Sequence, residues 1–136
     1  MTGRADDTAG YVLPPVELAA VAAGDTSTVL GPIVPYDAVI TGVELVPRAN
    51  VTANGTNYGV LTIQNRGPLA SGNVAAASRS WATVNSVAGT KERATLSGTP
   101  ANLEVKAGDQ LQFVRTTFGT GLAMPAMTAL VTFRAR

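Results

Sequence analysis

The chain has 136 residues and contains neither cysteine nor histidine. This length suits one domain, and the composition excludes disulfides, thiol chemistry, thiolate metal sites and histidine acting as base or ligand. Charged residues are only 14% of the sequence and the formal net charge is +1, which gives no electrostatic argument for nucleic acid. No apolar run reaches the roughly 18 residues of a membrane helix, so we expect no membrane partner.

The first residues are small and polar, and they end in the apolar tip Tyr11, Val12 and Leu13, followed by Pro14. Paired prolines fit neither a helix interior nor a central strand, so residues 1–15 are predicted to form an extended arm, with one domain over 16–136. The tip has no evident core of its own, which favours either disorder or docking on a neighbouring subunit. The N-terminus lacks the apolar region of a secretory signal.

Short alternating runs predict β-strands along the rest of the chain. The segment 16–30 favours strand, turn and strand, and 31–35 an irregular crossing. The run 38–46 is predicted to place Val39, Thr41, Val43 and Leu45 on one face, before a loop around Asn54. Further strands are expected over 58–65, around Trp81 and over 102–105, 110–116 and 127–133, whereas 68–80 carries little signal.

About eight such strands, separated by turns rich in Gly, Pro and Asn, predict an all-β fold, an antiparallel β-sandwich or jelly roll. Its inner faces are expected to hold Val43, Leu45, Leu61, Ile63, Leu111, Phe113, Val131 and Phe133. The turn Lys106–Asp109 is predicted to join two strands by a tight reversal.

Candidate chemistry is sparse in the sequence. Glu44 and Glu104 could meet in space as a carboxylate pair, but the sequence gives no further sign of a catalytic pair. The aspartates are isolated, the glycine-rich loop 119–121 lacks phosphate-loop spacing, and Lys91-Glu92-Arg93 is interpreted as a solvated loop. The sequence therefore predicts a non-enzyme without cofactor or metal. Trp81, Tyr36 and Tyr58 are the candidates for stacking a sugar, with Trp81 favoured as a core or interface residue.

Two stretches carry a resemblance. The first runs from Ile40 to Pro47 and continues through 57–67, and the second runs from 96 through Ala107-Gly108-Asp109 to Gly119-Thr120-Gly121-Leu122. Together they resemble the small β-sandwich capsid decoration (cement) proteins of tailed bacteriophages. The resemblance covers roughly residues 38–134 and contains no catalytic signature.

The resemblance implies a virion protein, made in the cytoplasm of the host bacterium, that sits on the assembled capsid and bridges major capsid subunits, often as a homotrimer. Candidate residues for capsid or inter-subunit contact are Tyr11, Val12, Leu13, Pro14, Asn54, Thr120 and Leu122. The alternative is a carbohydrate- or receptor-binding β-sandwich of a phage fibre or tail. An exposed aromatic platform would favour that alternative, and a flat apolar face in contact with another chain would favour the decoration protein.

Overall fold

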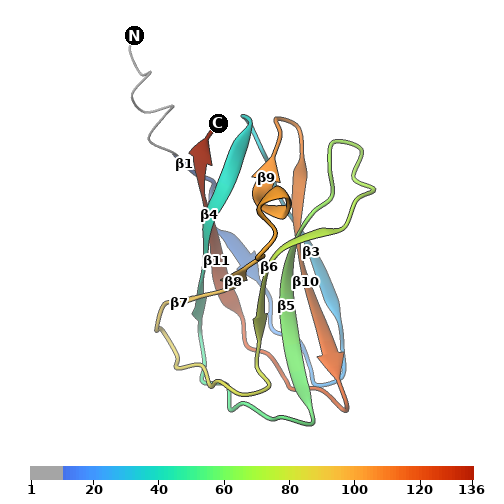
Figure 1. Ribbon diagram of the computed structural model, residues 1–136. Helices are drawn as coiled ribbons and strands as arrows, with labels where there is room; N and C mark the ends of the chain where they lie inside the picture. Colours follow the sequence, from blue (N-terminus) through green and yellow to red (C-terminus); the bar gives the residue numbers. More distant parts are fainter. Residues whose placement is uncertain (1–10) are drawn as a thin grey trace.

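The computed structural model describes residues 11–136, and they form two antiparallel β-sheets packed against each other (Figure 1). The first sheet has the order β1-β11-β4-β7, with β2 also on β11 and β9 also on β4, and the second has the order β3-β10-β5-β6-β8. This confirms the predicted all-β sandwich. Among the described residues no helix is long and apolar enough to cross a membrane.

The chain passes repeatedly between the two sheets. The first sheet comprises β1 (Tyr11–Val12), β2 (Val16–Leu18), β4 (Ala38–Pro47), β7 (Glu92–Arg93), β9 (Glu104–Val105) and β11 (Met127–Ala135). The second comprises β3 (Ser27–Ile33), β5 (Tyr58–Asn65), β6 (Val74–Ser80), β8 (Thr95–Leu96) and β10 (Gln110–Phe118), and the 3-10 helix η1 (Pro100–Leu103) follows β8. The predicted irregular crossing at 31–35 is wrong for Gly31 to Ile33, which continue β3.

The core lies between the sheets and follows from period-two alternation, because successive side chains of a strand point to opposite faces. All eight side chains predicted to face inward are buried: Val43, Leu45, Leu61, Ile63, Leu111, Phe113, Val131 and Phe133. In the paired strands β5 and β10, Ile63 lies opposite Phe113, and both are almost fully buried. The alternation therefore accounts for these core positions, and the pairing of β5 with β10 brings Ile63 and Phe113 together.

A bulge in β4 reverses the orientation predicted for its first half. Phe133 of β11 pairs with Ile40, but its neighbour Thr132 pairs with Gly42, so β4 carries one extra residue at Thr41. The extra residue turns Ile40 inward and leaves Thr41 exposed, whereas Val43 keeps its predicted inward direction. The prediction that Val39 and Thr41 share a face with Val43 is therefore wrong.

Two other sequence predictions also fail against the tertiary structure. Residues 74–80, in the segment of little signal, form β6, whereas the residues that follow Trp81 lie outside any strand. The turn Lys106–Asp109 does not close a hairpin, because β9 pairs with β4 in one sheet and β10 pairs with β3 and β5 in the other. Here the chain crosses from one sheet to the other.

The predicted arm belongs partly to the sandwich. Its residues 1–10 lie outside the described part of the chain, but Tyr11 and Val12 form β1 against β11, and Leu13 is buried in the core at 7% exposure. The prediction that the apolar tip lacks a core of its own is thus wrong for Leu13. Val12 presents an apolar side chain to the solvent, at 54% exposure.

We predict that Phe113→Ala lowers the free energy of unfolding by about 3 to 5 kcal/mol, because it deletes a buried aromatic ring between the sheets. Val114→Ala is the matched control, since Val114 is the adjacent outward residue of β10 and is only partly buried. Urea unfolding of both variants measures the difference. A loss below about 1 kcal/mol for Phe113→Ala would contradict the register described here.

Candidate functional site

The charged residues of the second sheet are two arginines, and both point inward. Arg79 on β6 is 8% exposed and Arg115 on β10 is 3% exposed. No other residue of β3, β5, β6, β8 or β10 carries a charge. Since buried cations need partners, each arginine must reach groups within the sandwich.

Arg79 crosses to the first sheet, where its Nε donates a hydrogen bond to Oε1 of Glu92 on β7 at 2.8 Å. Its guanidinium carbon lies 4.5 Å from the ring centroid of Trp81, and Ser86 Oγ donates to Glu92 and accepts from the indole nitrogen of Trp81 at 2.7 Å. Further Arg79 donors reach the carbonyl oxygens of Ser80 and Val84. This network ties the loop between β6 and β7 to both sheets.

Arg115 also connects the second sheet to segments of the first. It donates to the side chain of Ser27 and to the carbonyl oxygens of Ala19 and Pro125, which lie in the segments next to β2 and β11. Burial lowers the pKa of the Arg115 guanidinium from its ordinary value, but arginine remains a cation in proteins. Both arginines are therefore structural cross-links between the sheets.

With its cations turned inward, the second sheet presents an uncharged outer face. Cross-strand partners on this face are Leu30, Gln112 and Gln64 in one row, then Val114 and Thr62, then Thr116 and Val60, and finally Phe118 and Tyr58. Ser78, Ser80 and Thr95 continue the face over β6 and β8. We refer to these residues as the uncharged face.

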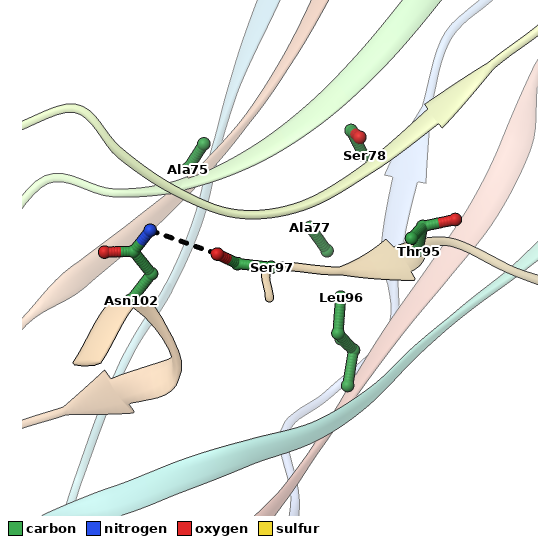
Figure 2. Close-up of a pocket in the computed structure, with 7 residues that line it drawn as sticks. All are labelled: Ala75, Ala77, Ser78, Thr95, Leu96, Ser97 and Asn102. Carbon is green, nitrogen blue, oxygen red and sulfur yellow. Dashed lines mark hydrogen bonds between the residues drawn. The ribbon is translucent and has the colours of Figure 1, made fainter. Parts of the chain in front are cut away.

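Two cross-strand pairs of side chains on the uncharged face contact each other. Gln112 donates to Gln64 at 2.6 Å across the strands, and the rings of Tyr58 and Phe118 stack at 4.7 Å between centroids. A hollow opens beside β8, lined by small residues that include Ala75, Ser78, Thr95, Ser97 and Asn102 (Figure 2). The hydrogen bond from Asn102 to Ser97 spans one side of it at 3.0 Å.

The first sheet differs, because its outer surface carries most of the ion pairs. Glu17 pairs with Arg48, Glu44 with Lys91 and Arg93, and Glu104 with Arg136. The hydroxyl of Thr128 and the guanidinium of Arg48 together lower the pKa of the Glu17 carboxyl. We call this surface the charged face. The sandwich therefore has one face suited to water and one that holds no charge.

The predicted contact residues fall at two places. Asn54 and Thr120 lie in adjacent loops, because Asn57 accepts a hydrogen bond from the Thr120 backbone at 2.8 Å, and Leu122, in the same loop as Thr120, packs against the core. Tyr11 pairs with Phe133 towards the other end of β11, and Pro14 follows it as an exposed residue. The structure thus brings two of the three segments together and leaves the third apart.

The candidate carboxylate pair and a cluster of metal-ligating side chains are both missing among residues 11–136. Glu44 and Glu104 have separate basic partners, and no group of three or more acidic, histidine or cysteine residues gathers in space. Asp109 instead accepts hydrogen bonds from Asn65 and from the backbone of Lys106, which stabilises the crossing turn. The sequence-predicted turn role of Asp109 therefore has a tertiary component.

The sequence analysis did not identify the inward direction of the two arginines or the contacts that they make inside the sandwich. The interpretation of Lys91-Glu92-Arg93 as a solvated loop is wrong for Glu92, which forms β7 and holds the buried Arg79. Trp81 is fully buried, as favoured, but its cation contact was not expected. The available signal was that Arg79 and Arg115 each fall on an inward position of an alternating strand.

Comparisons with known protein families, with curated proteins and with solved structures found no match to this chain.

We predict that Glu92→Gln destabilises the fold by about 3 kcal/mol, because it leaves the buried Arg79 cation without its counter-charge. Arg93→Gln is the matched control, since Arg93 is exposed and pairs with Glu44 at 3.8 Å, an arrangement worth less than about 1 kcal/mol. Thermal or urea unfolding compares the two. Equal losses would show that Arg79 does not depend on Glu92.

Proposed function

We propose that this protein binds the outer surface of an assembled bacteriophage capsid and stabilises it without catalysis, as a decoration protein. The observation that carries the proposal is the separation of charge between the two faces of the sandwich. The resemblance of the strand-and-turn pattern to phage decoration proteins supplies the kind of partner, which is the major capsid protein.

The uncharged face is the surface that we assign to the capsid. The central parts of protein interfaces are depleted in charged residues and enriched in aromatic ones. Thr62 and Val114 lie at the middle of this face, and the Tyr58–Phe118 pair lies at its end. Covering such a surface desolvates no charged side chain, so the association does not incur that cost.

Stabilisation follows from mass action. A decoration protein recognises a surface that exists only when neighbouring capsid subunits are together, so its binding energy is added to the assembled state alone. At 100 times the dissociation constant this contributes about 2.7 kcal/mol per site. The stabilising free energies of the many sites around one shell add together and oppose the internal pressure of the packaged DNA.

The alternative, a carbohydrate- or receptor-binding module, has weaker support. Trp81 is buried, and Tyr58 and Phe118 lie at 13° to each other, so each ring covers one face of the other. Tyr36 is 64% exposed, the highest value among the aromatic side chains whose exposure the structure describes. A flat stacking platform formed by several aromatic rings is not present among the described residues.

We predict that Thr62→Lys weakens binding to expanded phage shells that lack this protein, since it buries an unpaired cation at the interface. Thr41→Lys is the matched control, because Thr41 is exposed on the opposite sheet, which already carries ion pairs. Co-sedimentation gives the affinities, and the temperature of DNA release gives the stabilisation. Unchanged release temperature at saturating wild-type protein would remove the stabilising role.

Val12→Lys tests whether the apolar tip contributes to the capsid contact. Val12 is 54% exposed and β1 is held against β11, so the substitution changes the surface while Leu13 keeps its place in the core. If the apolar tip lies across the boundary between two capsid subunits, Val12→Lys is expected to reduce co-sedimentation with shells. Unchanged affinity would leave the contact to the sandwich faces alone.

A further inference from the structure

The seven-residue strand β3 differs from every other strand at a sheet margin in the described chain. The strands β1, β2, β7, β8 and β9 contain two or three residues each, and β2, β7 and β9 include charged side chains. In contrast, β3 contains no charged residue. Its one described strand partner is β10, and it forms the outer margin of the second sheet (Figure 1).

The outward side chains of β3 are apolar or neutral. Leu30 is 56% exposed and Ile33 is 62% exposed, and Thr28 is exposed as well. Proteins usually protect long sheet edges by shortness, charges, prolines or bulges, because an open edge is a template for strand pairing. The irregular register with β10 takes in Gly31 and Pro32 near the end of β3, so Ser27 to Leu30 retain a regular edge.

We propose that a second copy of this chain pairs with β3 through its own β3, antiparallel and across a two-fold axis. Each copy then supplies the main-chain partners that the other edge lacks, and main-chain hydrogen bonds of this kind give strand addition its affinity. Neither edge carries a charge, so the two copies meet without repulsion and without an unpaired buried ion. The isologous contact closes on itself and does not propagate into a fibre.

The pairing has a geometric consequence. It joins two five-stranded sheets into a continuous sheet of ten strands, which remains within the usual range. Because the two-fold axis of an antiparallel strand pair is perpendicular to the sheet, both uncharged faces lie on the same side of the dimer. The dimer does not depend on the proposed capsid function, and it differs from the trimer that the resemblance implies.

The test measures the oligomeric state of the full chain by sedimentation equilibrium at tens of micromolar. The wild-type protein is expected to be a dimer of the 13.9 kDa chain. Leu30→Lys is expected to raise the dimer dissociation constant by about a hundredfold or more, because it brings two cations together. Thr62→Lys is the control, since Thr62 lies on the central strand β5 of the same sheet. It should leave the dimer unchanged.

A second measurement locates the contact without weakening it. The chain has no cysteine, so Leu30→Cys carries a single spin label. Two labels in the paired dimer should lie within about 25 Å of each other, because β3 is seven residues long and a strand rises about 3.3 Å per residue.

Several results would overturn the pairing: a wild-type monomer, a trimer, a dimer that Leu30→Lys leaves intact although circular dichroism shows it folded, or labels at Leu30 that lie far apart. If Leu30→Lys fails to fold, the label distance decides alone. A wild-type dimer that fails to bind assembled shells would contradict the proposed function and leave the pairing standing.

Discussion

The two inward arginines are the constraint on which the rest of the structure depends. Arg79 and Arg115 start from neighbouring positions within the second sheet and end on groups of the first, through Glu92 in one case and backbone carbonyls in the other. A buried cation that lost these partners would cost several kcal/mol, so the sheets can slide or separate only at that cost. Hydrophobic packing forms the sandwich, and the two arginines fix the position of one sheet relative to the other.

The same arrangement explains the surface. Both cations of the second sheet are used inside, and its outer face is left with hydroxyl, amide and apolar side chains such as Thr62, Gln64 and Val114. The first sheet keeps its charges outside, in pairs such as Glu17 with Arg48. The inward direction of these two charges therefore has two consequences. It cross-links the sheets, and it leaves an outer face that a partner can cover without desolvating ions.

The sequence was sufficient for the fold class and for most of the core, because alternation is a local property of each strand. It identified the inward directions of Leu61, Phe113 and Val131. It failed at Thr41, where a bulge depends on how β4 meets β11, and at 106–109, where the chain crosses between sheets and does not form a hairpin. Both failures concern pairing between distant segments, which a local pattern does not contain.

The candidate surface was harder to predict than the core for a similar reason. The absence of charge on one face is a property of five strands taken together, and β6 lies in a segment whose Ala and Ser residues gave no strand signal. The role of Glu92 required knowing that β7 lies beside the inward Arg79. Local charge clusters were therefore interpreted as solvated, although one member is the main counter-charge of the interior.

We propose that the uncharged face is buried against the capsid when the protein binds. Hydroxyl-radical footprinting of the protein, free and bound to assembled phage shells, measures this directly through the reactivity of individual side chains. The account predicts that shell binding protects Tyr58, Val114 and Phe118, while Val46 and Leu130 on the opposite sheet keep their reactivity. Protection of Val46 and Leu130 with no change at Phe118 would contradict it.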